Sequence, residues 1–230
     1  MNKFLEKYSV PVSIMIAGLF VAGAVLLSNF YAPKNEDALA DVSEGIEEET
    51  FYQYAAPITD ADRILGNKDA KIKVVTYADM ECSYCMTFED TMNTLVSEYN
   101  GQVAWVYRHF PLDFHENAMS AAIASECAAD VAGEGKFWEF MTKFKDAVNA
   151  GGLVDVKAIA SSVGAGGSAF DECYSSNKFA DKIDGDYNNG IEAGLQGTPY
   201  SVVFADGTPV GMVDGAYPIE DVKAAIDPYL

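Results

Sequence analysis

The chain has 230 residues, enough for one soluble domain with an appendage but few for two full domains. Half of these residues are hydrophobic, so a substantial core can form. The 35 acidic residues outnumber the 15 basic ones and give a net charge of −20, which argues against nucleic-acid binding because phosphate recognition needs clustered Lys and Arg.

The N-terminal segment predicts a membrane anchor. Residues 10–27 carry no charge, and this length is close to the shortest that spans a bilayer as a helix. Lys3 and Lys7 precede the segment and acidic residues follow it, which places the rest of the chain outside the cytoplasm. We therefore predict a cytoplasmic N-terminus at residues 1–9 and a single transmembrane helix at residues 10–30.

A cleaved signal peptide is the alternative for the same segment. Cleavage needs small residues soon after the apolar run, and residues 28–32 form a poor site. A better cleavage site at residues 38–40 lies too far along the chain, so the uncleaved anchor is preferred. If cleavage did occur, it would leave a secreted or periplasmic protein. Residues 31–56 are strongly acidic and are interpreted as a mostly solvated linker.

The next elements indicate an α/β sheet. Residues 71–79 alternate and are rich in β-branched side chains, which predicts a strand, and residues 102–109 predict a second one. Between them, residues 82–99 place apolar side chains at helical spacing. A strand, a helix and a strand in this order imply parallel pairing through a right-handed crossover.

A helical block follows, and Gly-rich breaks separate several of its helices. The predicted helices span residues 116–132, 136–148, 155–163, 168–175 and 178–195. Residues 200–205 and 209–214 then predict a hairpin that turns at residues 206–207, and residues 218–229 predict a closing helix. The pattern is an α/β sheet with a helical insertion between its two halves.

The string Cys82-Ser83-Tyr84-Cys85, at the predicted strand-to-helix junction, is the candidate active site. Its spacing puts both sulfur atoms on one side of a helical turn, where a disulfide can form. Backbone N–H groups and the helix dipole favour a thiolate at Cys82, which makes the disulfide more oxidising. Cys85 lies one turn deeper, so we expect a substrate thiolate to attack Cys82 and Cys85 to leave.

Zinc binding is another explanation for this spacing. Zinc needs four ligands, but Cys127 and Cys173 are isolated in the sequence, and His109 and His115 are the only histidines. No metal is therefore predicted, and His109 is interpreted as a core residue at a strand end. A purely structural disulfide across one helical turn is disfavoured because it removes almost no chain entropy.

Several short motifs, taken together and in this order, resemble the DsbA-like branch of the thioredoxin superfamily. They are YADMECSYC at 77–85, YRHFP at 107–111, ECA at 126–128, GKFW at 135–138 and GTP at 197–199. The resemblance covers residues 57–230 and implies a thioredoxin fold with a helical insertion at about 115–195, following the single transmembrane helix. It also implies that Pro199 is cis and faces the cysteine pair, and that the Thr198 backbone binds an extended substrate.

The resemblance also bears on the remaining cysteines and on the dipeptide. Some DsbA-like proteins carry a second disulfide in the insertion, which implies a structural Cys127–Cys173 bond worth about 4 kcal/mol in the chain-entropy model. Two free buried thiols are the alternative. Well-known members often have Pro-His between the reactive cysteines, where this chain has Ser83-Tyr84, so the dipeptide should tune the redox potential. The charge of Glu81 should oppose the thiolate.

These features predict an enzyme that forms disulfides in reduced exported proteins and needs no cofactor. A catalytic oxidant needs an electron outlet, so the expected partner is a membrane oxidase resembling DsbB or the vitamin K epoxide reductase family. A reductase or isomerase on the same fold is the first alternative. A non-catalytic metal-binding or adaptor domain is the second, and no nucleic-acid partner is expected.

Overall fold

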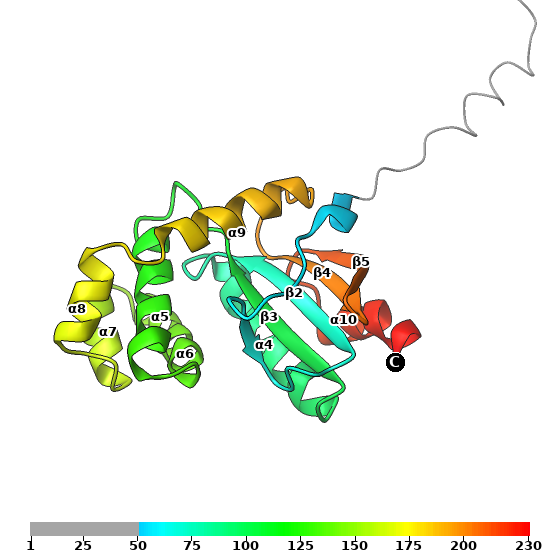
Figure 1. Cartoon of the computed structure of the whole chain (residues 1–230), viewed down its shortest axis with the longest axis horizontal. Helices are drawn as coiled ribbons and strands as arrows, with labels where there is room; N and C mark the ends of the chain where they lie inside the picture. Colours follow the sequence, from blue (N-terminus) through cyan, green and yellow to red (C-terminus); the bar gives the residue numbers. More distant parts are fainter. Residues whose placement is uncertain (1–50) are drawn as a thin grey trace, which may run out of the picture. The chain divides into compact units, whose positions relative to one another are not determined.

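A five-stranded mixed sheet lies at the centre of residues 51–230, the part of the chain that the computed structural model describes (Figure 1). β2 pairs in parallel with β3, which confirms the predicted parallel pairing, and the other pairings are antiparallel. The order across the sheet is β1-β3-β2-β4-β5. The strands are β1 (Arg63–Leu65), β2 (Ile72–Ala78), β3 (Val103–His109), β4 (Tyr200–Ala205) and β5 (Thr208–Asp214).

Alternation along the central strands gives the sheet two buried faces. In β2, Val74 belongs to one core cluster and the adjacent Val75 to the other, as expected when successive side chains point to opposite faces. The same division separates Trp105 from Val106 in β3. Both faces therefore need covering, and helices cover them.

Two helices pack on the face that contains Val74. They are α4 (Ser83–Glu98) and α10 (Ile219–Ile226). The two helices contact each other, and α4 also contacts β3 while α10 contacts β5. On the opposite face α9 (Ala180–Glu192) contacts β2, β3 and the 3-10 turn η1 (Phe51–Tyr54). The result is a layer of helix on each side of the sheet.

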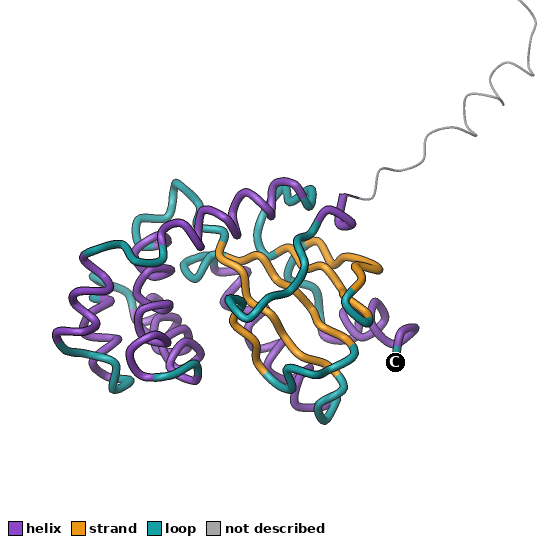
Figure 2. The backbone as a smooth tube through the Cα atoms, viewed as in Figure 1, coloured by secondary structure: helices purple, strands orange, loops and turns teal. Residues whose placement is uncertain are grey.

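The insertion forms a group of helices beside the sheet, and α9 leads the chain back from it (Figure 2). Three of its aromatic side chains, Phe137, Phe140 and Phe144, are fully buried. These side chains belong to the same apolar cluster as the α4 face of the sheet, so the insertion and the sheet share a core. The helices are α5 (Ala118–Ala132), α6 (Gly135–Ala150), α7 (Val156–Ser162) and α8 (Ser168–Ser175).

The main corrections fall at the start of the described region. β1 was not predicted, and residues 51–56 were assigned to the linker. The Asn189 side chain in α9 accepts a hydrogen bond from the Ala56 N–H at 2.9 Å and donates one to the Tyr54 carbonyl at 3.1 Å. These bonds tie the end of the predicted linker to the folded domain.

The predicted N-terminus, the anchor at residues 10–30 and most of the acidic linker lie outside the described residues. Within residues 51–230, no helix has both the length and the apolar character needed to cross a membrane.

Candidate active site

The end of β2 and the start of α4 bring the two reactive cysteines together beside Thr198. Cys82 is the N-cap of α4, in an extended conformation, and Cys85 lies in the first turn. Both are free thiols and both are buried, each with 7% of its surface exposed. The Cys82 thiol donates to the Thr198 carbonyl oxygen, 3.7 Å away. The candidate nucleophile thus contacts the segment expected to bind substrate.

Hydrogen bonding makes the two thiols chemically unequal. The pKa of Cys82 falls from 9.0 to about 5, mainly because the Cys85 thiol donates a hydrogen bond to it. Burial opposes this shift, and the backbone N–H groups of Cys85 and Tyr84 support it. Burial raises the pKa of Cys85, and its hydrogen bond to Cys82 and the negative charge there raise it further. The reduced pair at neutral pH is therefore a thiolate at Cys82 and a thiol at Cys85.

Thr198 and Pro199 form the wall opposite the cysteines. The peptide bond between them is cis, as the resemblance implied. The next residue, Tyr200, pairs with Tyr77 near the end of β2, which positions the Thr198–Pro199 segment beside the loop that leads to Cys82. Thr198 is only partly buried, so its backbone borders the surface next to the reactive sulfur.

A small cavity lies beneath the site, and Cys85, Pro199 and Glu89 all line it. Glu89 is buried, and burial raises its pKa. Its carboxylate accepts a hydrogen bond from the Thr142 hydroxyl at 3.2 Å and lies 3.3 Å from the Lys145 ammonium group. Glu89 and Cys85 thus share one cavity, through which a carboxyl group of raised pKa could exchange a proton with the thiol.

The sequence analysis did not identify Glu89, although a signal was present. Glu89 follows Cys85 by four residues, so both lie on the same face of α4, together with Met92. Acidic side chains are rarely buried unless they are paired. A glutamate within an apolar helical stripe therefore indicates a paired or functional carboxylate. Its partner Lys145 comes from α6, far along the chain, and is not visible from local sequence.

The dipeptide between the cysteines faces solvent. Ser83 is exposed, and 69% of the Tyr84 surface is exposed. Glu81, expected to oppose the thiolate, is held elsewhere: its carboxylate accepts hydrogen bonds from the Asn117 backbone N–H at 2.6 Å and from the Asn117 side chain at 2.8 Å. The pKa of Cys82 is governed mainly by the hydrogen bonds that Cys82 receives and by the burial of Cys82, not by the charge of Glu81.

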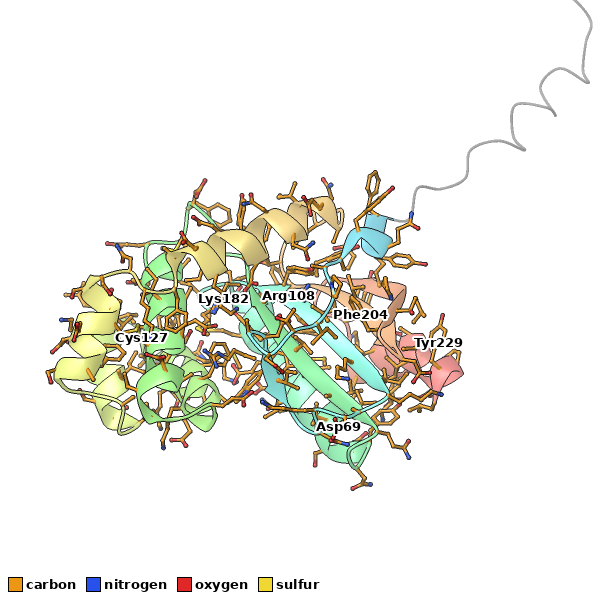
Figure 3. All side chains as sticks on the ribbon, in the orientation of Figure 1. Asp69, Arg108, Cys127, Lys182, Phe204 and Tyr229 are labelled. Carbon is orange, nitrogen blue, oxygen red and sulfur yellow. A yellow bond between two sulfur atoms is a disulfide. The ribbon has the colours of Figure 1, made fainter. Side chains whose placement is uncertain are left out.

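The other two cysteines are joined in the helical insertion. Cys127 in α5 and Cys173 in α8 form a disulfide with a Cα–Cα distance of 5.8 Å, the pairing that the resemblance implied (Figure 3 labels Cys127). Both are buried among apolar side chains. Neither lines the cavity that Cys85 lines, and we assign the bond a structural role.

His109 belongs to a buried ionic network between the sheet and the insertion. Its Nε2 atom lies 3.0 Å from the Glu126 carboxylate, which is fully buried and also pairs with Arg63 and, at 3.4 Å, with Lys182 (Figure 3 labels Lys182). Burial alone would raise the pKa of Glu126, but these three partners lower it to about 2. This agrees with a structural role for His109. Across residues 51–230, no three His, Cys, Asp or Glu side chains are grouped to hold a metal ion.

Comparisons with known structures show the fold. The structure resembles α-DsbA1 from Wolbachia pipientis with a TM-score of 0.65 and 21% sequence identity, over 77% of this chain and 95% of that one. It also resembles a periplasmic thioredoxin-like protein from Salmonella enterica serovar Typhimurium, with a TM-score of 0.61 and 20% identity over 79% of this chain and 97% of that one.

One sequence relative is a much longer protein, of which only a segment matches this chain. The Na⁺/H⁺ antiporter NhaA 3 of Salinispora tropica is 40% identical over 104 residues, which are 44% of this chain and 15% of the antiporter. The chain therefore spans only a small part of that relative, and the antiporter's name does not describe it. A family model described as Thioredoxin matches residues 59–228. This chain is a member of the thioredoxin family with the fold of DsbA-like proteins.

Proposed function

We propose that this chain is a thiol–disulfide oxidoreductase that acts outside the cytoplasm and forms disulfides in exported proteins. The observation that carries the proposal is the low pKa of Cys82 beside a buried Cys85 of raised pKa. Stabilising the Cys82 thiolate stabilises the reduced pair and so makes its disulfide a stronger oxidant. The likeness to DsbA-like structures supports the same chemistry.

The exchange proceeds in two balanced steps from the oxidised pair. A substrate thiolate attacks the Cys82 sulfur, a bond forms between them, the Cys82–Cys85 bond breaks, and Cys85 leaves as a thiolate that takes up a proton. A second substrate thiolate then attacks the substrate sulfur of the mixed disulfide and releases Cys82 as a thiolate. The substrate loses two electrons and the cysteine pair gains them. Thr198 and Pro199 hold the substrate segment against Cys82.

Glu89 supplies the proton in the first step. Burial raises the pKa of Glu89, which favours the protonated carboxyl, and Glu89 lines the same cavity as Cys85. Without a donor, a thiolate would be left in a buried site, which is costly. In the reverse direction Glu89 accepts the Cys85 proton, so that Cys85 can resolve a mixed disulfide.

The proposed location rests on the N-terminal sequence, and the proposed partner rests on the need of a catalytic oxidant for an electron outlet. We assign residues 10–30 to an uncleaved anchor after a cytoplasmic segment at 1–9, residues 31–50 to an acidic linker and residues 51–230 to the catalytic domain. The charges around the apolar segment support this orientation. The reduced pair would return its electrons to a membrane oxidase of the DsbB or vitamin K epoxide reductase type.

Two cysteine variants test the function. Cys82→Ser removes the attacked sulfur and is expected to abolish disulfide transfer to a reduced unfolded protein. Cys85→Ala keeps the Cys82 thiolate but removes the resolving thiol. With a substrate that already contains a disulfide, Cys82 cleaves that bond, and the variant is expected to accumulate the resulting mixed disulfide. Ser83→Ala is the matched control, because Ser83 is exposed in the same turn and carries no sulfur. Undiminished transfer by Cys82→Ser would exclude the proposal.

A further inference from the structure

We infer that the groove beside Cys82 selects substrate segments that carry a Lys or Arg side chain next to the reacting cysteine. This inference rests on the proposed function and adds a substrate class to it. The groove has a volume of about 430 Å³ and runs from the Thr198–Pro199 segment and Tyr84 to the loop between β5 and α10. A substrate bound to Thr198 has its neighbouring side chain within reach of this groove.

A single charged side chain lines the groove. Asp214, the last residue of β5, is exposed and lies opposite Tyr200 in the hairpin. Among residues 51–230 its carboxylate makes no salt bridge or side-chain hydrogen bond, and no basic residue lines the groove.

The nearby charges strengthen the negative character. Glu220 and Asp221 are exposed in the first turn of α10, just beyond the groove. The one basic residue of α10, Lys223, is already paired with Glu98 at 2.8 Å and with Glu220 at 3.2 Å. A Lys or Arg side chain of the substrate can therefore pair with the Asp214 carboxylate without competition from a basic residue of this chain.

Two aromatic rings form the other part of the surface. Tyr84 has 69% of its surface exposed and Tyr217 has 48%, and both line the groove. The position of a Cβ atom at Gly215 is 3.4 Å from the Tyr217 ring, so this ring rests against the Gly215 backbone. The stem of a Lys or Arg can pack between the rings while its charged end reaches Asp214, with a further contribution from cation–π contact.

The test uses the oxidised full chain and reduced two-cysteine peptides that differ at one position beside the first cysteine. That position carries Lys, the uncharged norleucine or Glu, and a second series places it on the other side of the cysteine. We expect the Lys peptide to be oxidised about threefold to tenfold faster than the norleucine peptide and the Glu peptide to be slowest, the size given by one exposed ion pair with cation–π contact. Added salt should reduce the preference.

Two variants assign the preference to the groove. Asp214→Asn should bring the Lys and norleucine rates together. Asp206→Asn is the matched control: it removes the same charge at the turn of the same hairpin, has no side-chain hydrogen bond to lose, and should keep the preference. Equal Lys and norleucine rates in the parent chain, or a preference that survives Asp214→Asn, would overturn the inference. A chain that oxidises none of the peptides would instead refute the proposed function.

Discussion

The chain contains two cysteine pairs that differ in their position in the fold and in whether they are bonded. Cys82 and Cys85 are three residues apart at the start of a helix and are free thiols in the structure. Cys127 and Cys173 are separated by 46 positions, join two helices of the insertion and are bonded. A bond across one helical turn constrains the unfolded chain very little, whereas a bond that closes a long loop constrains it strongly. Position in the fold thus makes one pair reactive and the other structural.

The environment of each pair supports this division. Cys82 receives hydrogen bonds from Cys85 and from backbone N–H groups of α4, and it contacts Thr198 at the surface groove. Cys127 and Cys173 lie among apolar side chains of the insertion. All four cysteines belong to the same apolar cluster, so the hydrogen bonds to Cys82 are what allow a thiolate to form there.

The largest expected effect is the pH dependence of the reduced chain's stability. The Cys82 pKa is lowered from 9.0 to about 5, a difference that corresponds to about 5 kcal/mol at full effect. This contribution is fully present above pH 9.0, the ordinary pKa of the unfolded thiol, and is lost as the pH falls through about 5. Denaturant unfolding of the chain with only the Cys82–Cys85 pair reduced should show stability rising with pH across this interval.

Cys82→Ser provides the control for that measurement, because it lacks the thiolate and keeps the same fold. The stability difference between the reduced parent chain and this variant should grow with pH. A difference that stays constant from pH 5 to pH 9 would show that the Cys82 thiol has an ordinary pKa.

Removal of the second disulfide is expected to have the next largest effect. The double variant Cys127→Ala/Cys173→Ala should lose about 4 kcal/mol of unfolding free energy, as expected for a closed loop of this length. Its reduction potential at Cys82–Cys85 should not change. A shift in that potential would show that the two pairs are coupled and that the comparison between them is too simple.

Substitution of Glu89 is expected to have a smaller effect that is confined to the reactive pair. Glu89→Gln should slow the attack of Cys85 on a mixed disulfide with glutathione by about a hundredfold at neutral pH, the low end for a general base. Asp90→Asn is the matched control, since Asp90 is exposed and also pairs with Lys145, at 2.6 Å, but does not line the cavity. Equal rates for the two variants would remove Glu89 from the mechanism.

Local patterns were sufficient to predict most of the elements. The β4 strand and the α8 helix have the predicted bounds, and β2, β3 and α4 differ from prediction by one or two residues. β1 was missed because it has only three half-buried residues and lies at the edge of the sheet, paired with β3 alone. Such a strand has no alternating pattern of its own, and its pairing with β3 is a tertiary property.

The candidate site was predictable where its parts are adjacent in sequence. The Cys82–Cys85 pair was found from its spacing and its place between a strand and a helix, and the Thr198–Pro199 segment only through the resemblance. Glu89 and the groove at Asp214 were not found. Each depends on segments that meet only in the folded chain: α6 supplies Lys145 to Glu89, and β5 brings Asp214 beside the segment that precedes β4.

The central claim is that the structure makes Cys82–Cys85 an oxidant, and the reduction potential of this pair tests it most directly. The full chain can be equilibrated in glutathione buffers of graded potential and the free thiols trapped, with the Cys127→Ala/Cys173→Ala variant confirming that only the first pair is followed. The lowered pKa of Cys82 predicts a value shifted from that of reductants toward about −120 mV, the value of a strong disulfide-forming catalyst. A value near about −270 mV, typical of reductants, would contradict the account.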